Sequence, residues 1–197
     1  MAGSNISEEV RNFLNTTARN NFIQKMEELK LLINQNPQVY FNYFVHQILL
    51  KKMNVAPAIL QIYIDAIKVI GIKDSISLTI SVIMDLFRKC MLINEDMLNQ
   101  VVSLRPQQGV SFIKQYLIQL GQFLGLLTVA NNRPIYAKEL DIKQLLVEGF
   151  TSEKMKYVVT FVCRILKECQ KSTIFKNQNP WVKANLDILK EIYLIIS

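Results

Sequence analysis

The chain has little of the chemistry from which active sites and metal sites are built. Its 197 residues include three cysteines and one histidine. Cys90, Cys163 and Cys169 form no C-x-x-C pair, which argues against a disulfide framework and leaves almost no basis for a zinc site. We expect the two cysteines at 163 and 169 to pack in a core and the protein to work in a reducing compartment.

Segments that would direct the chain to a membrane are also missing. No charged stretch precedes a short apolar run near the start, and no run of eighteen apolar residues lacks a charge. Neither a signal peptide nor a membrane span is therefore indicated, and we expect a cytoplasmic protein without membrane contact. The opening Met1-Ala2-Gly3-Ser4 resembles a cloning scar. The uncapped apolar end at Leu194 to Ile196 suggests that residues 5–197 form a single domain cut from a longer protein.

Glycine and proline are scarce, with six and five residues, while half of the chain is hydrophobic. Apolar residues recur at spacings of three and four, which predicts about ten helical segments and no strand. Two-helix units recur about every 35 to 45 residues, a pattern typical of HEAT-type repeats. The sequence therefore predicts an all-α helical solenoid of about five antiparallel helix pairs, with an irregular helical bundle as the alternative.

The few prolines and glycines mark where helices begin, end and cross. We expect Pro37, Pro57 and Pro180 to open helices and Gly71 to cap one. Residues 105–109 are predicted to be a loop before a helix over 112–127, and a short helix is expected from residue 94. Gly121 and Gly125, four residues apart, predict a close helix crossing. The residues expected to face inward include Ile23, Met26, Leu29, Leu32 and Ile33; Ile59, Leu60, Tyr63, Ile64 and Ile67; Ile142, Leu145, Leu146 and Phe150; and Tyr157, Val158, Phe161, Val162, Ile165 and Leu166.

No combination of residues predicts catalysis. His46 lies in an aromatic helical stretch, where a half-buried structural role is the expectation. Acidic pairs such as Glu8-Glu9 are adjacent in sequence, so they point about 100° apart on a helix and are expected on its surface. No glycine-rich phosphate-binding loop is present. We therefore expect no enzyme, no catalytic or metal-binding residue and no cofactor.

The net charge of +7 leaves RNA binding as an alternative. Lysines are spread along the chain, however, and alternate with acids, while most aromatic residues fall at core spacing. Contact with RNA is accordingly expected to be indirect or weak.

Several segments, taken in order, carry a family resemblance. They are residues 123–135, which end in Asn131-Asn132-Arg133-Pro134-Ile135, followed by 140–146, 157–159 and 175–181. Residues 24–29 and 49–53 agree more loosely. The chain resembles the middle domain of the Not-one scaffold subunit of the Ccr/Not deadenylase complex, a HEAT-type domain related to the middle domain of translation initiation factor four-G.

This resemblance implies a non-catalytic scaffold that acts in deadenylation, mRNA decay and translational repression. The implied partners are a deadenylase of the Caf-one/Pop-two type, a DEAD-box RNA helicase of the Dhh-one class and other Ccr/Not subunits. It also implies a cytoplasmic location that extends to processing bodies and a nuclear fraction. An initiation-factor-four-G-like module that binds RNA or a translation helicase is the alternative.

The resemblance further implies that the helicase contacts the segment after the Pro-Ile break, at Tyr136, Lys138, Asp141 and Lys143. Tyr136 and Asp141 have a second interpretation, as caps of the following helix. The run Tyr136-Ala137-Lys138 and the segment 105–109 depart from the family pattern. No residues are assigned to the docking of the nuclease.

Overall fold

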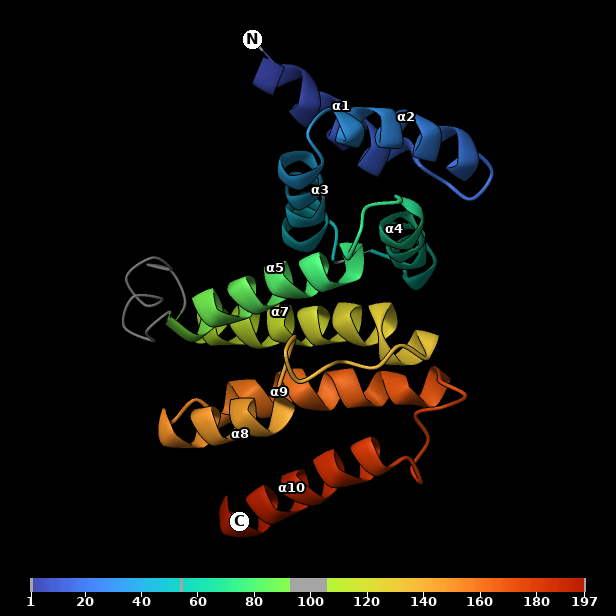
Figure 1. Cartoon of the computed structure of the whole chain (residues 1–197). Coiled ribbons are helices and arrows are strands. Elements are labelled where there is room, and N and C mark those ends of the chain that lie inside the picture. Colours follow the sequence, from blue (N-terminus) through green and yellow to red (C-terminus); the bar gives the residue numbers. More distant parts are fainter. Residues whose placement is uncertain (1, 54, 93–105, 197) are drawn as a thin grey trace. The chain divides into compact units, whose positions relative to one another are not determined.

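The computed structural model describes residues 2–53, 55–92 and 106–196, and the side chains of residues 8–53, 55–92 and 112–195. Within these ranges the chain forms α-helices and two short 3-10 helices and no strand (Figure 1), which confirms the all-α prediction. The elements are α1 (Ala2–Thr16), α2 (Phe22–Gln35), α3 (Pro37–Lys51), α4 (Pro57–Val69), α5 (Ser75–Leu92), α7 (Pro106–Leu127), η1 (Val129–Asn131), α8 (Ile142–Thr151), α9 (Met155–Lys167), η2 (Glu168–Lys171) and α10 (Pro180–Ile196).

The chain divides into two compact units, Met1–Ile83 and Met84–Ser197, with the boundary inside α5. Within each unit, helices that follow one another pack together: α1 on α2 and α2 on α3 in the first, α8 on α9 in the second. This arrangement is compatible with a helical solenoid. The expectation of a single domain over residues 5–197 stays a prediction.

The first unit is held together by contacts between helices distant in sequence. The ring of Phe13 in α1 meets the ring of Phe44 in α3 edge to face, with centroids 5.6 Å apart. The buried hydroxyl of Tyr63 in α4 donates a hydrogen bond of 2.8 Å to the carbonyl of Leu14 in α1. A buried hydroxyl needs such a partner, so α4 is fixed against α1 by polar as well as apolar contacts.

The second unit is organised around the contact of α7 with α9, which lie side by side (Figure 1). A Cβ atom on Gly121 would lie 2.6 Å from the carbonyl oxygen of Phe161, and one on Gly125 would lie 2.7 Å from Cγ of Glu168. Only glycine allows the two backbones to approach this closely. The close helix crossing predicted from the two glycines is therefore confirmed.

Prolines open four of the helices that the structure describes. Pro37, Pro57 and Pro180 begin α3, α4 and α10 as predicted, because the fixed φ of proline suits the first helical position and its missing N–H is not needed there. Pro106 begins α7, so the prediction of a loop over 105–109 is wrong for the described residues 106–109. The same rule, applied to Pro106, would have given the correct start. The short helix expected from residue 94 lies outside the described residues.

Other helix limits differ slightly from the prediction. Helix α1 begins at Ala2 and so includes part of the segment that was set aside as a cloning scar. Helix α9 ends at Lys167, and the 3-10 helix η2 continues to Lys171. Gly71 has φ +82° just beyond α4, as expected of a glycine that ends a helix.

Most residues predicted to face inward are buried, including all six on α9. The prediction is wrong for Ile23 and Phe150, whose surfaces are 80% and 53% exposed. Each lies about 100° around its helix from the centre of the buried stripe, so correct spacing alone did not place it inside. Ile59, in the first turn of α4, is also exposed.

Candidate protein-docking surface

The segment between α7 and α8 carries the residues that the sequence implicates in partner binding. It begins where Asn132 takes a left-handed conformation, φ 62°, which asparagine tolerates better than most residues. The side-chain oxygen of Asn132 accepts hydrogen bonds from the hydroxyl of Ser172 at 2.7 Å and from the N–H groups of Thr173 and Ile174 at 2.9 and 3.2 Å. These bonds tie the segment to the chain that follows η2 and fix its base.

An ion pair closes the loop above this base. Nη2 of Arg133 lies 2.6 Å from Oε1 of Glu139, and Nη1 lies 3.1 Å from Oε2. The carboxylate side chain is only 5% exposed, and it also accepts a hydrogen bond of 3.2 Å from the N–H of Tyr136. Bidentate pairs of this kind are stronger and more directional than single hydrogen bonds. The loop that carries Tyr136 is therefore held in one shape.

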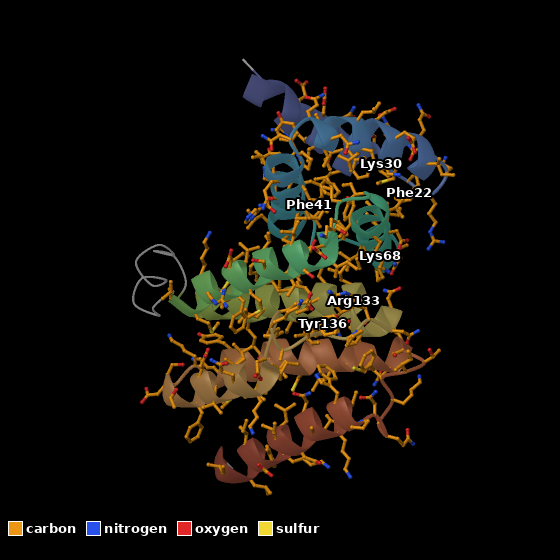
Figure 2. The ribbon with its side chains drawn as sticks, in the orientation of Figure 1. Phe22, Lys30, Phe41, Lys68, Arg133 and Tyr136 are labelled. Atoms are coloured by element: carbon orange, nitrogen blue, oxygen red, sulfur yellow. The ribbon has the colours of Figure 1, made fainter. Side chains whose placement is uncertain are left out.

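Tyr136 projects from this loop, and 51% of its surface is exposed. The guanidinium carbon of Arg133 lies 5.6 Å from the centre of the ring, and Nζ of Lys138 lies 5.9 Å from it. Figure 2 labels Arg133 and Tyr136 close together in the view. Cations at this distance are attracted to an aromatic face. The result is an exposed ring with two positive charges close to it.

The other two implicated residues belong to α8. Asp141 is its N-cap, and its carboxylate accepts a 3.0 Å hydrogen bond from the N–H of Gln144. The capping interpretation is therefore confirmed for Asp141, whereas Tyr136 makes the ring contacts described above. Lys143 is exposed in the first turn, and Val147 and Phe150 follow it at intervals of four and three residues. Such spacing places the three on one face, an exposed stripe of one cation and two apolar side chains.

A groove of about 660 Å³ lies between the last part of α5 and the segment 137–141 with α8. Lys138 and Asp141 line it, whereas Tyr136 and Lys143 do not. Its apolar lining from α5 comprises Met84, Phe87, Met91 and Leu92, and its charged lining comprises Arg88, Lys138, Lys154, Glu139, Asp141 and Glu148. The lining thus contains three cations and three acids, so the groove suits a protein surface of mixed charge better than a polyanion. The α5 residues carried no signal in the sequence because their spacing is that of ordinary core.

The described residues offer no catalytic arrangement. Among them, no three His, Cys, Asp or Glu side chains lie close enough to hold a metal ion. His46 is half-buried in α3, as predicted. Burial raises the pKa values of Cys90 and Cys169 to about 11, so both thiols are protonated at neutral pH and are poor nucleophiles. Cys163 is exposed, so the prediction of core packing is wrong for this cysteine.

In the described part of the chain, no helix combines the length and the apolar character that crossing a bilayer requires.

Comparison with known proteins gives consistent matches along the chain. Residues 2–196 match the family described as the CCR4-NOT transcription complex subunit 1 CAF1-binding domain. The chain is similar to general negative regulator of transcription subunit 1 of Schizosaccharomyces pombe, with 28% identity over 184 residues that cover 91% of this chain. The protein of the same name in Saccharomyces cerevisiae is 27% identical over 191 residues and 97% of this chain. CCR4-NOT transcription complex subunit let-711 of Caenorhabditis elegans is 26% identical over 191 residues and 95% of this chain. The matches span 8%, 8% and 7% of the lengths of these three relatives.

Proposed function

The chain belongs to the family of CAF1-binding domains of CCR4-NOT transcription complex subunit 1, and on this premise we propose that it is a non-catalytic scaffold domain that docks a deadenylase of the Caf1 type. The observation that carries the proposal is the family match, which runs from residue 2 to residue 196 across both compact units. The role that follows is support of mRNA deadenylation and decay, with the nuclease chemistry supplied by the partner. Other CCR4-NOT subunits would join through the remainder of a longer protein.

Two measurements test this proposal directly. The purified chain should bind a recombinant Caf1-type deadenylase with one-to-one stoichiometry in isothermal titration calorimetry, and the chain alone should leave a poly(A) substrate intact. Absence of binding at micromolar concentrations, or shortening of poly(A) by the chain alone, would contradict it.

The second partner that we propose is a DEAD-box helicase of the Dhh-one class, which would bind at Tyr136, Lys138 and Lys143. These side chains are exposed, and the ion pair of Arg133 with Glu139 holds the loop in advance of binding. A surface that is already ordered loses less conformational entropy when a partner binds. In this proposal Asp141 acts indirectly, because its carboxylate caps α8 and so places Lys143.

Matched variants distinguish this surface from the remainder of the protein. We expect Tyr136→Ala and Lys143→Glu each to weaken helicase binding about tenfold, since exposed aromatic and charged anchors often dominate an interface. Tyr193→Ala and Lys114→Glu change the same residue types at other exposed positions and should leave binding unchanged. None of the four should alter deadenylase binding if the two partners use separate surfaces. Equal effects of the test and control variants would reject the assignment.

A scaffold that holds a helicase and a nuclease together would raise the effective concentration of each around one mRNA. If the helicase works by the closing of two lobes, a rigid surface that touches both lobes would also hold them in an arrangement ready for activation. This would link the domain to translational repression in the cytoplasm. Helicase ATPase activity should therefore rise when the chain is added. Binding without any change in ATPase rate would contradict this part of the proposal.

The alternative function is an initiation-factor-four-G-like module that binds RNA or a translation helicase. The net charge of +7 is the observation in its favour. RNA binding by contacts to phosphates would weaken steeply with salt. Tight, salt-sensitive binding of RNA by the isolated chain, together with no affinity for the deadenylase, would favour this alternative.

A further inference from the structure

A second groove, of about 330 Å³, lies between α9 and α10, outside the surface described above. Four of its lining residues are apolar and buried: Leu166, Cys169, Phe175 and Val182. Leu186 and Leu189 on α10 complete the apolar lining and are half-buried. The volume is at the lower end of the range of about 300–1,000 Å³ that binding pockets occupy. The groove can therefore accept a few apolar side chains of a ligand.

The walls of this groove are fixed by hydrogen bonds within the loop that joins η2 to α10. The hydroxyl of Ser172 accepts bonds from the N–H of Phe175 at 2.8 Å and from that of Ile174 at 3.0 Å. The side-chain oxygen of Asn179 accepts from the N–H of Trp181 at 3.0 Å, and the ring of Trp181 meets that of Phe175 edge to face at 5.8 Å. These contacts hold Phe175, which lines the groove, and the first turn of α10 in position.

The charged residues in the lining of the groove are both lysines. Lys167 and Lys176 line it and are exposed, together with the neutral polar side chains of Gln170 and Asn177. No acidic residue is among the described residues that line it. Glu168 is buried, and its carboxylate pairs with Arg164 at 3.0 Å and Lys171 at 2.8 Å. Asp187, which follows the lining residue Leu186, pairs with Lys190 at 3.7 Å. A ligand at the rim therefore meets mainly positive charge.

We propose that this groove binds an acidic amphipathic helix of a partner protein. The apolar floor would accept side chains from one face of such a helix, and Lys167 and Lys176 would pair with acids that flank this face. RNA would supply negative charge for the two lysines but no apolar side chains for the floor. Its bases need exposed rings on which to stack, whereas Phe175, the one ring in the lining, is buried. The groove shares no lining residue with the groove beside α8.

The probe is a synthetic peptide of about four helical turns, with leucines along one face and glutamates elsewhere. A scrambled peptide of equal composition and a single-stranded oligo(A) serve as comparisons. Cys163 lines the groove and is exposed, whereas Cys90 and Cys169 are buried, so alkylation of the native chain reports on this site. We expect the amphipathic peptide to slow alkylation of Cys163 at least fivefold and the scrambled peptide to have little effect.

A second experiment reverses the charge of the two lysines at the rim and measures binding of the peptide. The variant Lys167→Glu/Lys176→Glu should bind the peptide about tenfold more weakly in fluorescence anisotropy, because it replaces two attractions at the rim by repulsions. Lys89→Glu/Lys114→Glu makes the same change in net charge at exposed positions outside the groove and should bind within about twofold of the unaltered chain. Circular dichroism verifies that all variants are folded.

Three results would overturn the proposal. The scrambled peptide would protect Cys163 equally if only general charge attraction were involved. The two charge variants would weaken binding equally if the groove were not the site. Protection by oligo(A) without protection by the amphipathic peptide would identify a nucleic-acid site instead.

Discussion

The carboxylate of Glu139 accepts hydrogen bonds from the guanidinium of Arg133 with both of its oxygens, at 2.6 and 3.1 Å, across the loop that presents Tyr136. The Glu139 side chain is almost fully buried and the Arg133 side chain is 22% exposed, so the pair is shielded from most of the solvent. The same carboxylate accepts the N–H of Tyr136. The shape of the candidate docking loop therefore depends on this one acid.

Glu139→Gln is expected to loosen the loop without removing any residue proposed to touch a partner. The neutral amide keeps the size of the side chain but loses the charge that Arg133 requires, at a cost of about 1–3 kcal/mol in the free energy of unfolding. Hydrogen exchange at residues 133–140 should accelerate, and helicase binding should weaken. Glu191→Gln, which makes the same change at an exposed position on α10, should do neither. Unchanged exchange in Glu139→Gln would show that the ion pair does not hold the loop.

Asp141 allows a structural role to be separated from a binding role. Asp141→Ala removes the acceptor that caps α8 and should lower the free energy of unfolding by about 1 kcal/mol. Asp141→Asn retains a capping oxygen and should be nearly neutral in denaturant titrations. If Asp141 acts only as a cap, the asparagine variant binds the helicase normally. Loss of binding in both variants would instead place the carboxylate itself in the interface.

The sequence was sufficient for the fold class because helical periodicity and proline positions are local signals. Pro37, Pro57 and Pro180 began helices where expected. Pro106 also begins a helix, although the polar residues and the glycine that follow it are equally common in loops. The error at Phe150 has a different origin: periodicity defines a stripe, but the width of the buried part depends on what packs against it.

Most contacts at the candidate sites join residues that are distant in sequence or depend on the shape of a loop, so local sequence patterns do not predict them. The role of Asp141 as a cap followed from its position before α8, and this is a sequence-level signal. The contact of Arg133 and Lys138 with the ring of Tyr136 required the shape of the loop, as did the bonds of Asn132 to a segment some forty residues later. The groove between α9 and α10 likewise combines residues from two helices and a loop, whose apolar members resemble ordinary core in the sequence.

The glycines at the α7–α9 crossing should resist substitution. Alanine usually stabilises a helix relative to glycine by up to about 1 kcal/mol. At Gly121, however, the new Cβ would lie 2.6 Å from the backbone oxygen of Phe161, which cannot move without shifting α9. Gly121→Ala should therefore destabilise the protein by about 1–3 kcal/mol in urea titrations. Gln115→Ala, an exposed substitution on the same helix, should be close to neutral. A stabilised Gly121→Ala variant would contradict the close approach of the two helices.

The buried thiols predict a loss of stability at alkaline pH. Burial raises the pKa values of Cys90 and Cys169 to about 11, from about 9 for an exposed thiol. Between these values the unfolded chain releases the thiol protons while the folded chain keeps them, so the unfolded state binds fewer protons. The stability contribution is present below pH 9 and declines as the pH rises toward 11, with a limiting slope of about 1.4 kcal/mol per pH unit for each thiol.

Denaturant titrations across this pH range should show a shallower decline of the free energy of unfolding in Cys90→Ala than in the unaltered chain. Cys163→Ala, which removes an exposed thiol, should change the slope less. Equal slopes in the unaltered chain and Cys90→Ala would mean that the thiol of Cys90 ionises as readily in the folded protein as in the unfolded chain.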